Sequence, residues 1–308
     1  MTFISTKLLP MNSGKLWQLF ISGICWLAIQ HMPVSVYAQD RSIGVLVGAS
    51  NYTGDLQYRR YTFLEAHPAV GIFYDQEILP HFAARGMFSY ATISGDDRYG
   101  KDSTTILRNL SFQSHILELQ VNMRYQLWDL HEKPLTPYVF AGIALFHFNP
   151  TARDTNGQRV ALRPLSTEGE GLAAYPDRKP YALTQLAIPF GGGLLWAVSP
   201  SVRLGIEIGL RKTFTDYLDD VSKTYVDQNT LLTAKGPLAV RMAYRTNQLP
   251  GHQSDPYPPA GTPRGGKYKD WYYYTALTLS VRLPHKFRSM RDMQKNFGQS
   301  GVPCPPMK

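Results

Sequence analysis

Three segments of this chain alternate apolar and polar residues with a period of two, which is the pattern of a β-strand whose two faces have different surroundings. Residues 271–283, 117–127 and 202–211 each place apolar side chains on one face and polar side chains on the other. The charges fall on one face of each segment: Glu118 and Arg124 in the first half of the chain, and Arg203, Glu207, Arg211 and Arg282 in the second. We therefore expect strands here.

Five further segments are rich in Gly, Ala and aromatic residues and are weaker strand candidates: residues 42–50, 69–74, 82–93, 138–148 and 188–198. Pro189 opens the last of these, where a proline costs only the first hydrogen bond of the ladder. The total is eight predicted strands.

The connections between these strands are short and long in turn. Those after strands two, four and six are brief (76–81, 129–135 and 199–200), whereas residues 148–185 and 214–269 are long and rich in Pro, Gly, Ser and charge. Short turns at one end and long loops at the other are typical of outer-membrane barrels, with the short turns in the periplasm. The sequence predicts an all-β, eight-stranded antiparallel outer-membrane β-barrel with long extracellular loops.

A water-soluble β-sandwich or lipocalin-type barrel is the alternative, since its strands alternate as well. In that fold the charged faces would meet solvent. Small residues on the charged faces (Gly205, Gly209, Ala276 and Ser280) favour a narrow lumen instead. Aromatic residues near the strand ends, Trp128, Trp196, Trp271, Tyr272 and Tyr273, suit the girdles at the two membrane interfaces.

The chain divides into three predicted parts. Residues 1–38 have the order of a cleaved signal peptide, because Lys7 and Lys15 precede an apolar run at 16–29 and Ala38 ends a cleavage site before Gln39. A buried N-terminal helix is the alternative. No apolar run is long enough to span a bilayer as a helix. The barrel covers residues 39–283.

Residues 284–308 form a basic tail, which strand parity assigns to the periplasm. Its apolar residues would give a short amphipathic helix suited to a partner's groove, and a disordered tail is the alternative. Cys25 leaves with the signal peptide, so Cys304 is the one thiol of the mature chain. Neither an intramolecular disulfide nor a cysteine metal site is expected.

An eight-stranded barrel has an interior that side chains fill, so we do not expect a diffusion pore. Six charged residues on the inward faces would meet there: Glu118, Arg124, Arg203, Glu207, Arg211 and Arg282. Because an unpaired buried charge is costly, we interpret them as an ion-paired network that plugs the lumen. Gating by exchange of ion-pair partners is the alternative.

The sequence does not favour catalysis. His147, Ser166, Asp216, Asp219 and Asp220 are the candidate reactive residues of the rim, and none lies in a motif. Asp216, Asp219 and Asp220 could bind a hard cation but lack the spacing of a calcium loop, so pairing with Arg211 and Lys212 is the simpler interpretation. We expect no enzyme activity, catalytic residue, cofactor or resident metal.

The formal charge of +9 is spread along the chain apart from a cluster after Leu283. In an exported protein without a groove-reading motif, this charge does not indicate nucleic-acid binding.

Several segments resemble a Bacteroidota family of outer-membrane barrels that includes PorG, a component of the type IX secretion system. The resemblance spans most of residues 42–283 and is carried by these segments: 108–112 (RNLSF), 137–144 (PYVFAGIA) with Asn149-Pro150, 164–171 (PLSTEGEG), 175–178 (YPDR), 211–222 (RKTFTDYLDDVS) and 270–272 (DWY).

The resemblance implies a barrel that anchors or organises the secretion machinery, in contact with outer-membrane lipids and with proteins of its periplasmic ring. The family has no catalytic residues to carry over. This chain departs from the usual barrel ending, because Pro284 and a basic tail follow Leu283 where a barrel would stop at an aromatic residue. A surface barrel whose loops bind an external ligand or partner is the second hypothesis.

Overall fold

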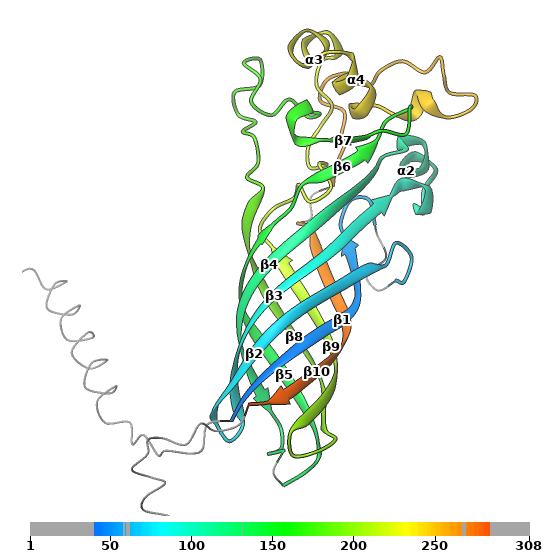
Figure 1. Cartoon of the computed structure of the whole chain (residues 1–308). Coiled ribbons are helices and arrows are strands. Elements are labelled where there is room, and N and C mark those ends of the chain that lie inside the picture. Colours follow the sequence, from blue (N-terminus) through cyan, green and yellow to red (C-terminus); the bar gives the residue numbers. More distant parts are fainter. Residues whose placement is uncertain (1–39, 58, 60–61, 131, 267–268, 284–308) are drawn as a thin grey trace, which may run out of the picture. The chain divides into compact units, whose positions relative to one another are not determined.

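The computed structural model describes residues 40–57, 59, 62–130, 132–266 and 269–283. In these ranges eight antiparallel strands close into a barrel (Figure 1). They are β1 (Arg41–Thr53), β2 (His67–Leu79), β3 (Phe82–Asp96), β4 (Ser111–Gln126), β5 (Leu135–His147), β8 (Thr184–Ala197), β9 (Val202–Thr213) and β10 (Trp271–Arg282). The β1–β10 and β3–β4 pairings complete the closure.

All eight predicted strands are confirmed, and most extend beyond the predicted bounds. The turns are correspondingly tight, with Pro80 and His81 alone between β2 and β3. The placement of Pro189 at a strand start is wrong, because β8 begins five residues earlier at Thr184. Its pairing with β5 is interrupted between Ala141–Phe190 and Ala144–Ala187, which fits a proline that has no N–H to donate.

The two faces of the barrel wall are opposite in polarity. On β4, Glu118, Gln120 and Arg124 are buried inside the barrel, while Leu119 and Val121 are more than half exposed on the outside. Apolar side chains on the outer faces of all eight strands form an apolar belt, defined by Ile43, Val45, Val47, Val70, Ile72, Phe88, Leu117, Leu119, Val121, Val139, Ile143, Leu145, Leu186, Leu194, Leu204, Ile206, Ile208, Leu277, Leu279 and Val281. A soluble sandwich or lipocalin-type barrel would have the reverse arrangement, so that alternative is wrong.

The predicted aromatic girdle is only partly correct. Trp128 and Trp196 lie exposed near the short turns. Tyr272 instead points into the barrel, where it is fully buried. Tyr273 is covered by the β1–β2 loop, because its hydroxyl donates to the carbonyl oxygen of Thr62 over 3.0 Å.

The long loops fold into a lobe at one end of the barrel (Figure 1). It contains α2 (Ser103–Arg108), β6 (Pro150–Arg153), β7 (Arg159–Ala161), α3 (Gln228–Lys235) and α4 (Pro237–Ala243), with the 3-10 turns η1 (Asp97–Tyr99), η2 (Arg163–Leu165) and η3 (Thr246–Gln248). The α3–α4 corner follows local rules. Asp227 caps α3 by accepting from the Thr230 amide, and Gly236, at φ +84°, stands between α3 and Pro237.

The lobe has its own apolar packing, in which Leu172, Val226 and Leu231 cluster with Ala239 and Ala243. Arg108 joins three of its loops. The guanidinium donates to both carboxylate oxygens of Asp97, to the carbonyl of Asp55 over 2.9 Å and to the carbonyl of Arg264 over 2.5 Å. The loops therefore form one folded body.

The predicted signal peptide (1–38) and basic tail (284–308, with Cys304) lie outside the described residues. Within the described part of the chain, none of the helices combines the length and apolarity that crossing a membrane would require.

Candidate functional site

Two sets of charged residues are candidates: a network inside the barrel and a cluster among the long loops. In the first, Arg85 lies between two carboxylates. Its Nε donates to Asp75 over 2.7 Å and its Nη1 to Glu207 over 2.8 Å. Arg124 adds a 3.1 Å bond to Asp75, and the Tyr138 hydroxyl donates to Glu207 over 2.8 Å.

A second group lies nearer the lobe. Arg211 contacts the carboxylate of Glu118 through Nε and Nη2 at 3.3 Å, and the Tyr272 hydroxyl donates to the same carboxylate. The Arg211 guanidinium also lies 3.8 Å from the centre of the Tyr274 ring. Gly209 makes room for it, since a Cβ there would lie 2.6 Å from Nη1 of Arg211. A larger residue at position 209 would therefore displace the Arg211 guanidinium.

A third group closes the end with the short turns. Arg203 pairs with Glu77 over 2.7 Å and with Asp40 over 3.5 Å, and Arg282 pairs with Asp40 over 2.8 Å. Arg282 is the partly exposed member of the six predicted lumen residues, and the other five are buried.

Among the residues that the structure describes, the ion pairs of the lumen join five arginines to five carboxylates: Arg85, Arg124, Arg203, Arg211 and Arg282 with Asp40, Asp75, Glu77, Glu118 and Glu207. Sequence reasoning missed Asp40, Asp75, Glu77 and Arg85. Continuing the alternation of β2 beyond Tyr74 would have placed Asp75 and Glu77 on a strand.

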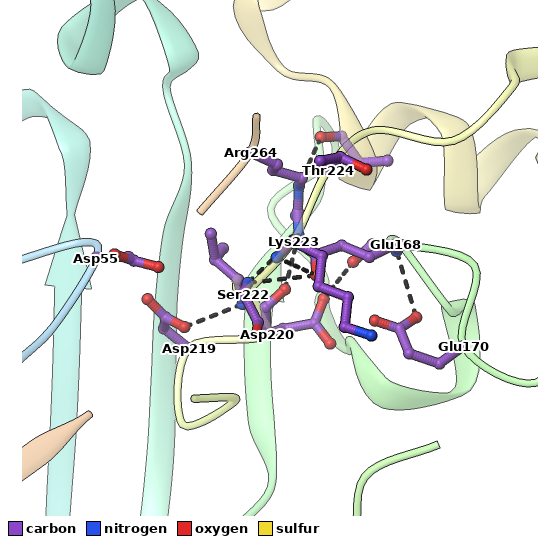
Figure 2. Close-up of polar contacts among 12 residues, drawn as sticks. Asp55, Glu168, Glu170, Asp219, Asp220, Ser222, Lys223, Thr224 and Arg264 are labelled. Carbon is purple, nitrogen blue, oxygen red and sulfur yellow. Dashed lines mark hydrogen bonds and ion pairs between the residues drawn. The ribbon is translucent and has the colours of Figure 1, made fainter. Parts of the chain in front are cut away.

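Figure 2 shows the second candidate, which we call the loop cluster: Asp55, Glu168, Glu170, Asp219, Asp220, Ser222, Lys223 and Arg264. Arg264 is central to it. Nη1 of Arg264 donates to Glu168 over 3.2 Å and to the carbonyl of Asp220 over 2.7 Å. Glu168 also accepts from the backbone amides of Ser222 and Lys223.

The three aspartates of the predicted acidic run have different partners. Asp220 accepts from the hydroxyls of Thr167 and Tyr181 at 2.6 Å. Asp219 lies 2.7 Å from the Tyr52 hydroxyl, and Asp216 accepts from Ser222 over 2.9 Å. The expected pairing with Arg211 and Lys212 is wrong. Arg211 turns into the lumen toward Glu118, and Nζ of Lys212 lies over the Trp271 ring.

No group of three or more His, Cys, Asp or Glu side chains in the described ranges is arranged to hold a metal ion. The Tyr52 hydroxyl also lies 2.7 Å from Asp270, so two buried carboxylates share one phenol. Burial, and then the neighbouring negative charges, raises the pKa of Asp219 well above its ordinary value. Asp219 therefore tends to hold a proton.

Other carboxyls of the loop cluster also have raised pKa values. Burial raises the pKa of Glu168 to about 7 against the opposing charge of Arg264. Burial and the charge of Asp220 raise the pKa of Glu170 to about 7. The pKa of Asp220 is raised to about 6, chiefly by burial. The loop cluster therefore takes up or releases protons near neutral pH.

The two remaining rim candidates, His147 and Ser166, do not belong to the loop cluster. His147 is exposed on β5, with Nδ1 2.9 Å from the Thr184 hydroxyl. Ser166 is buried, in a left-handed backbone conformation at φ +50°.

Closure of eight antiparallel strands, with charge inside and an apolar belt outside, gives this chain the fold of an outer-membrane β-barrel. A family model described as a domain of unknown function (DUF6089) matches residues 20–162, just under half of the chain. No curated protein matches.

Several solved structures of outer-membrane barrels are similar. A major outer membrane protein of Thermus thermophilus is 13% identical, covers 80% of this chain and 100% of its own, and has a TM-score of 0.39. Neisserial surface protein A is 10% identical, with 80% and 98% covered and a TM-score of 0.37. The N-terminal barrel domain of Pseudomonas aeruginosa OprF is 10% identical, with 79% and 97% covered and a TM-score of 0.34.

Proposed function

We propose that this protein resides in the outer membrane and works as a structural or docking component, not as a channel or an enzyme. The apolar belt supports the location. The side chains of Val47, Ile143 and Leu277 are 58%, 68% and 63% exposed, which is unfavourable in water and favourable in lipid.

The ion-paired interior is the observation that carries this proposal. Lumen charges such as Arg124, Arg211 and Glu118 are buried and held by one another and by phenols, so the interior is occupied by the protein's own side chains. A barrel filled in this way acts through its outer surfaces.

Fractionation tests the location. The protein should sediment with outer membranes, shift in apparent mass on heating as folded barrels do, and begin at Gln39 when mature. Recovery of the folded protein from the soluble periplasm would contradict the proposal.

The finer role that we propose is anchoring of the type IX secretion machinery through proteins of its periplasmic ring. The segments that resemble the PorG-containing family support it. Residues 164–171 lie in the lobe, and residues 211–222 run from the end of β9 into the lobe. Contact with the ring would fall to the short turns and to residues 284–308.

Gene deletion tests this role. Secreted cargo should accumulate inside the cell, and ring proteins should co-purify with the wild-type barrel. Normal secretion in the deletion strain, together with no ring protein in the purified complex, would contradict a secretion role.

The second candidate is a surface barrel whose lobe binds an external partner. The folding of the lobe favours it, because loops with buried packing and fixed hydrogen bonds present a preformed surface. Gene deletion separates the two candidates: secretion survives if the protein serves an external partner alone, and cargo accumulates if it serves secretion. Replacement of α3 and α4 by a short Gly-Ser linker should remove binding of an external partner and leave secretion unchanged, because the proposed ring contacts lie at the other end of the barrel.

A further inference from the structure

We infer that a groove between the lobe and the barrel wall binds the anionic headgroup of an outer-leaflet lipid. The inference rests on the proposed membrane location and concerns a ligand that the docking role does not include. The groove has a volume of about 300 Å³ and lies between the end of β3, the start of β4 and the β6–β7 hairpin.

Three arginines line this groove from two sides. Arg98, in η1, stands on one side, and Arg153 and Arg159, on β6 and β7, stand on the other. All three side chains are exposed. A planar guanidinium matches the oxygens of a phosphate better than any other side chain, so opposed arginines suit a phosphorylated group between them.

The arginines are held in place by neighbouring groups. Nε of Arg98 lies 3.2 Å from Asp96, and its Nη2 lies 3.8 Å from Glu65. Nη2 of Arg159 donates to Gln113 over 2.6 Å, and Nη1 of Arg153 donates to the carbonyl of Gly157 over 3.0 Å. A guanidinium has five N–H donors, so these contacts orient each arginine and leave donors for a ligand.

The groove lies at the height of a lipid headgroup. Along the outer face of β4, the exposed apolar residues end at Leu117, His115 follows, and Gln113 lines the groove. On β3, which pairs with β4, Tyr90 is the last large exposed side chain of the outer face and lies opposite Leu117. Acyl chains against Leu117 and Tyr90 would therefore bring the headgroup of the same lipid to the groove.

Binding to the full-length protein in detergent micelles tests the inference. The probes are a diphosphorylated glycolipid of the lipid A type, the same glycolipid after enzymatic removal of its phosphates, and inorganic phosphate. We expect the phosphorylated glycolipid to bind at least tenfold more tightly than either other probe.

The double substitution R98Q and R159Q should weaken that binding at least tenfold. Arg241→Gln, which removes one exposed charge on α4, is the control and should change it less than twofold. Arg153→Gln alone should weaken binding about threefold and provides a second variant if the double substitution disturbs folding, which the heat-dependent mass shift would reveal.

Equal binding of the two glycolipids, or unchanged binding by the variants, would overturn the site. Inorganic phosphate that binds as tightly as the phosphorylated glycolipid would overturn the lipid assignment. The micelle assay needs neither secretion nor native membranes, so its failure is distinguishable from a failure of the proposed function.

Discussion

Glu168 and Arg264 are 96 residues apart in the chain and form an ion pair of 3.2 Å, in which both side chains are shielded from solvent. The pair joins the β5–β8 loop to the β9–β10 loop. Because both partners are buried, removal of one would leave the charge of the other without a compensating charge.

Substitution of Arg264 by Met should therefore destabilise the lobe by about 3 kcal/mol at pH 8, where Glu168 is ionised. Hydrogen exchange of the amides at 166–172 and 218–226 measures the change. Arg241→Met, at an exposed position on α4, should stay within about 0.5 kcal/mol of wild type. Equal exchange in the two variants would show that the pair does not hold the lobe.

The raised pKa values predict a lobe that is more stable in acid. Glu168 and Glu170 have pKa values of about 7 in the folded lobe, above the ordinary value of about 4.3. A raised carboxyl pKa gives stability that is fully present below the unfolded pKa and is lost as pH rises through the folded pKa. Protection of lobe amides, corrected for intrinsic exchange rates, should fall between pH 5 and pH 8.

Glu170→Gln is the matched test of that dependence, because it removes one titrating group while it keeps an acceptor oxygen for the Glu168 amide. The fall in protection between pH 5 and pH 8 should be smaller in this variant. A profile identical to that of the wild type would exclude Glu170 as a source of the pH dependence.

Inside the barrel, Glu207→Leu should destabilise the protein by on the order of 3 kcal/mol, because Arg85 loses one of its two carboxylate partners and Tyr138 loses its acceptor. Denaturant unfolding in micelles measures this. Glu207→Gln keeps an acceptor for Tyr138 and should cost less. If Leu were tolerated as well as Gln, the charge of Glu207 would not matter to the lumen.

The outer face gives the complementary prediction. Ile206→Arg, next to Glu207 on the opposite face of β9, places a charge in the apolar belt and should cost about 2–4 kcal/mol in a bilayer. Phe214→Arg, just beyond the end of β9, should cost at most about 1 kcal/mol. Reconstitution into lipid vesicles followed by unfolding compares the two. Equal effects would contradict the position of the belt.

The barrel could be predicted from sequence because alternation is a local signal. Charges on one face of residues 117–127 and 202–211 identify strands and faces without knowledge of any partner. Asp75 is harder to predict because three polar residues in a row, 75–77, break the alternation of β2, and Arg85 is harder to predict because it lies between small residues. The position of Pro189 within its strand could not be predicted in this way. A proline inside a strand is tolerated where the neighbouring strand needs no N–H from it, and the sequence of one strand does not show how its neighbour pairs.

The loop cluster could not be predicted in the same way. Asp219 and Asp220 form an acidic run in sequence, and their partners are hydroxyls of Tyr52, Thr167 and Tyr181 on other loops and strands. Burial of these groups arises from the packing of loops against one another, which has no period along the chain. Composition alone therefore suggested solvent-exposed loops where the structure has a folded lobe.

Arg108 has a consequence for how this protein can be altered. Because its guanidinium holds the loop at Asp55, the segment at Asp97 and the loop at Arg264 together, these loops are not independent modules. A graft of one loop into another barrel would leave its partners behind, so the loops must be transferred, and must diverge, as a set. The tip of the β6–β7 hairpin, where residues 155–158 are exposed, is where an epitope can be inserted without disturbing that set.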